Sequence, residues 1–226
     1  MKETPSADVA VEERAALLLA VRRAGVRDLS VMRAFEAVPR EAFAPYRFRD
    51  LANNNMSLPL GCGQTMSRPS DLARRIEALR VGREHRVLEV GAGSGYGTAI
   101  LARLAREVVS LERFATLSIE ATRRLAGLGV DNVSVIHADG LAPDAELGDF
   151  DRIIVNAALE EPPAALLRRL TPRGALVYVL SEKKAGDKRP RQRLVKVDLT
   201  ENGELRETGL GQHSIGFAAF GLAGAL

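Results

Sequence analysis

The stretch Val87-Leu88-Glu89-Val90-Gly91-Ala92-Gly93-Ser94-Gly95-Tyr96 decides the fold of this chain. Val87, Leu88 and Val90 form a short apolar run typical of a buried strand, and residues 98–104 have the three-to-four-residue apolar spacing of an amphipathic helix. The three alternate glycines therefore lie in a strand-to-helix turn, where glycine permits positive φ and lets a ligand approach the backbone. The N-terminus of the following helix offers unpaired N–H groups. The stretch predicts a cofactor-binding turn.

An acidic residue follows at the distance expected for a nucleoside ligand. Glu112 closes the next apolar run, residues 108–111, and lies 21 positions after Gly91, where an acidic side chain can meet ribose hydroxyls. The dinucleotide fingerprint needs a further glycine where this chain has Tyr96 or Thr98, so NAD fits poorly. S-adenosylmethionine is the common cofactor with a ribose and adenine but no pyrophosphate. An ordinary tight turn with a surface glutamate is the alternative interpretation.

The pattern around this turn predicts a Rossmann-like, doubly wound, mostly parallel α/β sheet. Strands are expected at residues 86–90, 108–112, 133–138, 151–157 and 175–180, with antiparallel edge strands at 194–199 and 215–220. Helices are expected at residues 8–24, 29–37 and 71–79, with a long irregular segment at 46–70 of the kind that is usually functional. We expect an N-terminal helical and substrate-facing segment, residues 1–80, and an α/β domain, residues 81–226, in one compact unit.

Polar residues follow two of the predicted strands. Asp139-Gly140 comes after the third strand, and Asn156-Ala157-Ala158 ends the fourth. Because ligands of open α/β sheets bind at the carboxyl ends of the strands, both are expected to face the cofactor crevice. Asp139 could also simply form a turn with Gly140, and the sequence leaves the two interpretations open.

The composition describes a globular protein without strong nucleic-acid affinity. The chain has 226 residues, 46% hydrophobic and 27% charged, with a small net charge of +3. Its single cysteine, Cys62, and three scattered histidines predict neither an internal disulfide nor a metal site. The N-terminal sequence is neither a signal peptide nor a membrane span, so we expect a cytoplasmic protein. The basic stretch 183–193 lacks aromatic residues and is expected to be a solvated loop.

Over residues 28–180 the chain resembles the protein-L-isoaspartate (D-aspartate) O-methyltransferase family. The Gly-Gln-Thr-x-Ser-x-Pro element at residues 63–69 is the specific part of the match. The motifs that carry the resemblance are, in order, Val38-Pro39-Arg40-Glu41-Ala42-Phe43, Leu58-Pro59-Leu60-Gly61-Cys62-Gly63-Gln64-Thr65-Met66-Ser67-Arg68-Pro69, the stretch 87–96, Leu111-Glu112-Arg113, Asp131-Asn132-Val133, Ala138-Asp139-Gly140 and Asp151-Arg152-Ile153-Ile154-Val155.

The resemblance implies a class I S-adenosylmethionine-dependent methyltransferase. Such an enzyme transfers a methyl group to the α-carboxylate of L-isoaspartyl residues in damaged proteins and releases S-adenosyl-L-homocysteine. The methyl ester then collapses to a succinimide, which allows net repair. We expect a monomer that acts on isoaspartyl proteins or peptides, without membrane or nucleic acid.

The resemblance also assigns residues to three roles. Ser67 would position the substrate carboxylate, with Gln64 and Thr65 shaping the same loop. The residues implied in cofactor binding are Glu89, Gly91, Ala92, Gly93, Gly95, Tyr96, Glu112, Arg113, Asp139 and Gly140. Those implied in substrate binding are Leu60, Asn156 and Ala157.

This chemistry agrees with the residues that the chain has. A carboxylate with a pKa of about 4 is already ionised at neutral pH, so no general base, metal or covalent nucleophile is required. Catalysis reduces to in-line positioning and exclusion of water. Ser67 would supply a hydrogen bond for that alignment. A hydroxyl at a helix N-terminus, just ahead of Pro69, is its alternative interpretation.

Four positions depart from the family pattern. Asn53 and Asn54 replace an aromatic and an acidic residue, Gly97 replaces glutamine, and Asn156 replaces threonine. Residues 215–220 replace an Arg-Phe-Val-Pro type segment. The cofactor half is therefore better preserved than the substrate half. Two other functions follow as alternatives: a methyltransferase of the same fold with another substrate, such as a small carboxylic acid or RNA, and a non-catalytic S-adenosylmethionine-binding protein.

Overall fold

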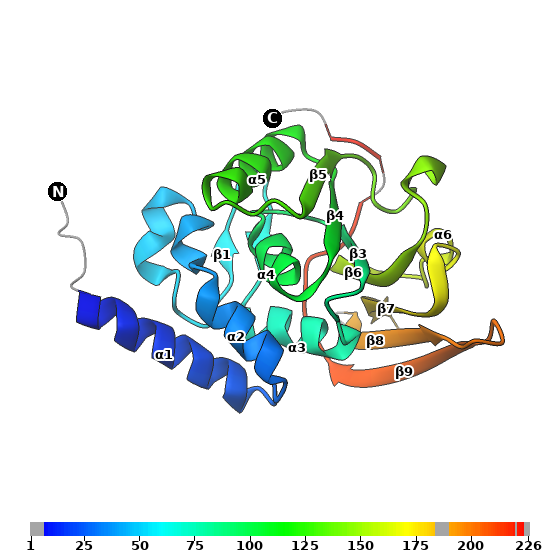
Figure 1. Cartoon of the computed structure of the whole chain (residues 1–226), viewed down its shortest axis with the longest axis horizontal. Coiled ribbons are helices and arrows are strands. Elements are labelled where there is room, and N and C mark those ends of the chain that lie inside the picture. The colour runs from blue at the N-terminus through cyan, green and yellow to red at the C-terminus, as the bar shows by residue number, and fades with distance from the viewer. Residues whose placement is uncertain (1–6, 184–189, 220, 224–226) are drawn as a thin grey trace.

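A central sheet organises the molecule (Figure 1). The computed structural model describes residues 7–183, 190–219 and 221–223. Within them, the strands of the large sheet follow the order β5-β4-β3-β6-β7-β8-β9, with β3 to β7 parallel and β8 and β9 antiparallel. The strands are β3 (Arg86–Val90), β4 (Glu107–Glu112), β5 (Val133–His137), β6 (Phe150–Leu159), β7 (Leu170–Glu182), β8 (Arg191–Leu199) and β9 (Leu205–Gln212). The predicted doubly wound α/β class is confirmed.

Helices precede the sheet and alternate with its strands. In Figure 1, α1 and α2 lie at the lower left, and the β8–β9 hairpin lies at the lower right. Asp28 caps α2 through hydrogen bonds from the backbone N–H groups of Ser30 and Val31. The helices are α1 (Ala7–Arg23), α2 (Leu29–Ala37), α3 (Pro69–Leu79), α4 (Tyr96–Leu104), α5 (Ala115–Gly127) and α6 (Ala164–Leu167).

The segment between α2 and α3 is less irregular than expected. It contains two short 3-10 helices, Arg40–Ala42 and Tyr46–Leu51. It also contains a two-stranded antiparallel ladder, in which β1 (Leu58–Pro59) pairs with β2 (Thr65–Met66). This small ladder brings the residues before Ser67 back over the carboxyl end of the large sheet.

Apolar side chains cover both faces of the sheet. Successive residues of a strand point to opposite faces, so Val87 joins one core cluster and Leu88 the other. The cluster around Val87 also includes Leu17 and Phe35 from the N-terminal helices and Ile76 from α3. Residues 1–80 and the α/β sheet therefore bury side chains in the same core.

The C-terminal part of the sheet differs from the prediction. The expected edge strand at residues 215–220 is wrong: the edge strand is β9, and Phe217 forms only an isolated parallel bridge with Ala158. Residues 215–219 leave the sheet edge after β9 and stay partly or largely exposed, with Phe217 52% exposed; Phe220 lies outside the described residues. Residues 184–189 of the basic stretch also lie outside, while Arg191 and Arg193 belong to β8. Among the described residues, no helix has the length and apolarity that crossing a bilayer demands.

The strand order determines where the sheet can bind a ligand. The chain fills one side of β3 with β4 and β5 and then returns to the other side with β6. The carboxyl ends of β3, β4 and β6 therefore meet at the topological switch point, where open α/β sheets bind ligands.

Candidate functional site

The glycine turn after β3 adopts the predicted conformation. Gly91, Gly93 and Gly95 have φ values of +91°, +55° and +87°, in the left-handed region that favours glycine. The Gly91 N–H donates to the Leu111 carbonyl at 2.7 Å, which ties the turn to β4. Gly95 is the N-cap residue of α4. The turn therefore presents backbone at its glycines to the space above the strand ends.

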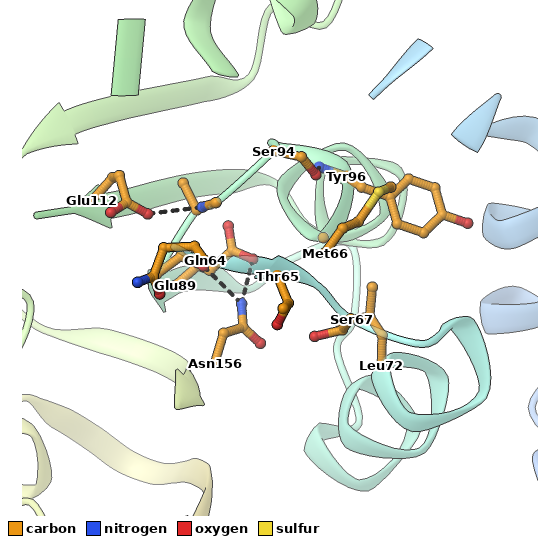
Figure 2. A pocket seen from close by; sticks show the side chains of 14 residues that line it. Gln64, Thr65, Met66, Ser67, Leu72, Glu89, Ser94, Tyr96, Glu112 and Asn156 are labelled. Atoms are coloured by element: carbon orange, nitrogen blue, oxygen red, sulfur yellow. Dashed lines mark hydrogen bonds between the residues drawn. The ribbon is translucent and has the colours of Figure 1, made fainter. Parts of the chain in front are cut away.

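Two adjoining pockets, of about 530 and 570 Å³ and open to solvent, occupy this edge. Four predicted residues line both pockets, namely Gln64, Gly91, Glu112 and Asn156. The first pocket, shown in Figure 2, adds Thr65, Ser67, Glu89, Ala92, Gly93 and Tyr96 from the prediction. The second adds Arg113, Asp139, Gly140 and Ala157.

Two predicted residues stand behind the pocket walls. Leu60 is buried, and its side chain packs behind Gly93, where a Cβ would lie 3.5 Å from Leu60 Cδ1. Gly95 faces α5, because a Cβ there would lie 3.2 Å from that of Ala121. Tyr96 lines the first pocket, but its ring is buried among Phe35 and Phe43, with centroids 5.9 and 5.7 Å away. The cofactor and substrate roles of all these residues stay predictions.

Glu112 holds the glycine turn in place. Its Oε2 accepts a hydrogen bond from the Gly93 N–H at 2.8 Å, and its Oε1 accepts one from the Phe114 N–H at 3.0 Å (Figure 2). The side chain is nearly buried and lies where the two pockets meet. The acidic residue predicted from its spacing to Gly91 is thus in contact with the turn itself.

Asp139 and Gly140 fit both interpretations left open by the sequence. Asp139 Oδ1 accepts from the Leu141 N–H at 2.9 Å, which is a local turn, and Oδ2 accepts from the Gly221 N–H at 2.7 Å. Both residues also line the second pocket. Gly140 packs so closely on β3 that a Cβ there would collide with Val90 Cγ1. Asp139 therefore forms a turn and, at the same time, holds the backbone at Gly221 through a hydrogen bond.

A buried arginine organises the loop that carries Ser67. The Arg40 guanidinium donates to the carbonyls of Ala52, Asn54, Met56 and Ser67, the last three at 3.2, 3.0 and 3.0 Å. Burial lowers the pKa of Arg40 to about 10, so it stays charged at neutral pH. Because most of these carbonyls have no ladder partner, Arg40 supplies the hydrogen bonds that regular structure would supply elsewhere.

The Ser67 hydroxyl does not cap α3. Arg68 is the N-cap residue of that helix and makes no side-chain capping bond. Ser67 Oγ instead accepts a hydrogen bond from Arg75 Nη2 at 3.0 Å. In Figure 2, the side chains of Thr65, Ser67 and Asn156 lie around the same part of the first pocket. The helix-terminus interpretation of Ser67 is therefore wrong.

Glu89 lies at the centre of a buried polar network. Its Oε2 accepts from Thr98 Oγ1 at 2.5 Å and from Ser110 Oγ at 2.6 Å, and its Oε1 accepts from Asn156 Nδ2 at 2.8 Å. Burial raises the pKa of Glu89 to about 7, against the effect of these three donors. Asn156 Oδ1 accepts from Arg75 Nη2 at 3.3 Å. The Asn156 amide thus separates a buried carboxyl from a buried guanidinium.

Sequence reasoning missed Arg75 and the C-terminal segment. Arg75 carried a usable signal, because it follows Leu72 by three positions and precedes Leu79 by four, on the apolar face of the predicted helix. An arginine on that face must be buried or must distort the helix packing. Residues 217–219, which line the second pocket, carried no such signal. No group of three or more His, Cys, Asp or Glu side chains in the described ranges could hold a metal ion.

Solved structures are similar to this chain in their fold. A protein-L-isoaspartate O-methyltransferase structure matches 92% of this chain and 67% of its own, with a TM-score of 0.78 and 26% identity. A putative protein-L-isoaspartate O-methyltransferase from Plasmodium falciparum, in complex with S-adenosyl-L-homocysteine, matches 89% of this chain and 96% of its own, with a TM-score of 0.73 and 23% identity. The fold is that of a class I S-adenosylmethionine-dependent methyltransferase.

The sequence comparisons identify the family. The sequence model of protein-L-isoaspartate (D-aspartate) O-methyltransferase matches residues 12–213, and the chain belongs to this family. A protein-L-isoaspartate O-methyltransferase of Rhodopseudomonas palustris (strain BisB18) is 50% identical over 165 residues, 73% of this chain and 76% of the relative. One from Nitrobacter winogradskyi is 43% identical over 203 residues, 90% and 91% of the two chains. The resemblance stated from the motifs is confirmed.

Proposed function

We propose that this chain transfers a methyl group from S-adenosylmethionine to the α-carboxylate of L-isoaspartyl residues in damaged proteins. The products are S-adenosyl-L-homocysteine and a methyl ester, which closes to a succinimide with loss of methanol and thereby allows repair. Membership of the isoaspartyl methyltransferase family supports the reaction. The structural observation that carries the proposal is the shared pocket, in which the Ser67 hydroxyl and the glycine turn face the same space.

The residues present fit the cofactor. The glycine turn brings backbone to the first pocket, because Gly91 and Gly93 line it and carry no side chain. Glu89 and Glu112 bring carboxyl groups to the first pocket, which favours the cationic groups of a sulfonium amino acid. Asp139, Leu141 and Phe217 line the second pocket, where a polar edge and apolar walls suit an adenine ring. When bound, S-adenosylmethionine supplies an activated methyl group.

The chain's own residues have only to position the acceptor. The acceptor carboxylate is ionised at neutral pH, so no side chain need remove a proton. In the proposed mechanism, Ser67 donates a hydrogen bond to one carboxylate oxygen and leaves the other oxygen aimed at the methyl group. Met66 and Leu72 give the first pocket an apolar wall that excludes water around the reacting atoms. Thr65 and Gln64 are exposed and lie at its rim.

Methyl transfer to a pair of peptides tests the proposal. Labelled S-adenosylmethionine is offered with a short isoaspartyl peptide or with its aspartyl counterpart, and label is expected only on the first. A Ser67→Ala variant should lose about 10- to 100-fold in kcat/KM, the value of one hydrogen bond to a charged group. Its affinity for S-adenosyl-L-homocysteine should stay within about twofold of the wild type, since Ser67 does not form the glycine turn.

Two results would contradict this function. Absence of label on the isoaspartyl peptide, with S-adenosyl-L-homocysteine binding retained, would mean that the substrate half serves another acceptor or none. Unchanged turnover in Ser67→Ala would remove Ser67 from the mechanism.

We propose further that the protein acts in the cytoplasm as a monomer and without nucleic acid. The small net charge of +3 supports the last point. Sedimentation at micromolar concentration checks the oligomeric state. A salt-dependent shift on added RNA would contradict the absence of nucleic-acid binding.

A further inference from the structure

Arg75 is a buried cation without a carboxylate partner. Its side chain is 0% exposed, and in the described part of the structure it forms no ion pair. Nη2 donates to Ser67 Oγ and Asn156 Oδ1, and Nη1 lies 2.9 Å from His213 Nε2. Burial and the neighbouring arginines lower the pKa of His213 to about 3, so the imidazole is neutral and its Nε2 accepts. All three partners of Arg75 are therefore neutral acceptors.

An uncompensated charge of this kind is costly to bury. Burial lowers the pKa of Arg75 to about 10, with Asp71 and Glu89 opposing the shift, so the guanidinium is still charged at neutral pH. Two of its partners, Ser67 and Asn156, line the first pocket, while Arg75 itself lies behind them. An anion placed in that pocket against these two side chains would be the missing counter-charge.

The hydrogen bond from Arg75 also fixes the polarity of Ser67. A serine hydroxyl has one proton to donate and two lone pairs to accept with. Because Oγ accepts from Arg75 Nη2, its own proton is free to point into the pocket. Figure 2 shows this hydroxyl on the side of Ser67 that faces Asn156. The arginine thus prepares Ser67 to be a donor, which is the role that an anionic acceptor requires.

We propose that Arg75 is a positioning residue for the acceptor carboxylate, acting through the Ser67 hydroxyl and supplying the positive charge behind it. The inference rests on the proposed function and specifies why the acceptor must be an anion. Arg75 does not touch the acceptor in this arrangement: Ser67 and Asn156 carry its effect to the pocket.

Three variants test the assignment on the full-length protein. Arg75→Met removes the charge and the hydrogen bonds but keeps an apolar stem in the core. Arg75→Lys keeps the charge. Arg74→Met is the matched control, because Arg74 lies on the same helix, is half-buried and, among the described residues, donates only to the Leu210 carbonyl at 3.4 Å. Thermal unfolding and S-adenosyl-L-homocysteine affinity are measured for each variant beside isoaspartyl peptide kinetics.

We expect Arg75→Met to lower kcat/KM by about 10- to 100-fold, the range of a hydrogen bond to a charged group. S-adenosyl-L-homocysteine affinity should stay within about twofold, Arg74→Met should match the wild type, and Arg75→Lys should recover part of the loss. In a Ser67→Ala background, Arg75→Met should lower kcat/KM by a smaller factor than in the wild type, because the part of its effect that passes through the Ser67 hydroxyl is already lost.

A binding comparison isolates the charge. With S-adenosyl-L-homocysteine bound, Arg75→Met should weaken binding of the isoaspartyl peptide but leave binding of the isoasparaginyl peptide unchanged, since that amide carries no charge. Two results would show that Arg75 is purely structural and would overturn the inference. One is an equal loss of binding affinity for both peptides, and the other is an equal loss of kcat/KM with and without the Ser67 hydroxyl. If Arg75→Met does not fold, the same measurements on Arg75→Lys, alone and combined with Ser67→Ala, test the inference. A wild-type protein that transfers no methyl group would overturn the proposed function and this inference together, whereas an active wild type with an unaffected Arg75→Met would overturn the inference alone.

Discussion

Glu89 is a carboxyl group that the fold removes from water on every side. It lies on β3 with 0% exposure, and three side-chain donors surround it. Burial raises its pKa from the ordinary 4.5 to about 7. Between these two pH values the folded protein holds a proton that the unfolded chain has released. Rising pH therefore destabilises the folded state across this window, and the loss is complete above about pH 7.

This linkage predicts how a Glu89→Gln variant behaves. The amide cannot ionise, so the variant does not share the loss of folding stability that the wild type undergoes between pH 5 and 8. We expect the Tm of Glu89→Gln minus that of the wild type to become more positive as the pH rises through this range, as thermal unfolding at several pH values would show. A difference that does not change with pH would mean that Glu89 is ionised throughout.

At the scale of elements, the C-terminal segment, residues 213–219, closes the crevice without joining the sheet. After β9 the chain returns over the strand ends, where the Ile215 N–H donates to Gln192 Oε1 at 2.8 Å and the Ala218 N–H to the Ala158 carbonyl at 2.9 Å. The bulge in β6 between Ile154 and Ala158 meets this segment and takes Asn156 out of the ladder. Together they form one wall of the second pocket.

A chain ending at Ser214 would lack that wall. We expect S-adenosyl-L-homocysteine to bind about tenfold more weakly, because a ligand that loses roughly 60 Å² of apolar contact loses about 1.5 kcal/mol. Far-UV circular dichroism should change little, since the described part of the segment adds only isolated bridges to the sheet. Calorimetric titration measures the affinity, and an unchanged value would show that the segment is not part of the cofactor site.

At the scale of the whole molecule, one core joins the N-terminal helices to the sheet. Leu17, Phe35 and Ile76 pack in the same cluster as Val87 and Val177. We expect residues 1–80 and 81–226 to unfold in a single cooperative transition, with equal calorimetric and van't Hoff enthalpies. Residues 81–226 expressed alone should expose this face and aggregate. Two separate transitions would show two independently stable domains, so this measurement also tests the predicted division of the chain.

The sequence by itself determined the parts of this protein that depend on short-range patterns. The apolar run before Gly91, the left-handed glycines and the spacing to Glu112 predicted the turn, the parallel sheet and the cofactor edge, because backbone sterics and strand periodicity act over a few residues. The Gly-Gln-Thr-x-Ser-x-Pro motif indicated the family, which the comparisons confirmed.

Tertiary structure alone decided how distant residues meet. Asn156 contacts Glu89 and Arg75 from positions 67 and 81 residues away, so no local pattern could place it between them. The sequence marked the edge strand in the wrong place because an apolar run alone does not show what it lies against: residues 217–219 line the second pocket and do not pair along a sheet edge. Arg75 shows both sides of this division: its position on an apolar helix face was readable, but the absence of a counter-charge beside Ser67 depends on what the whole fold brings around it.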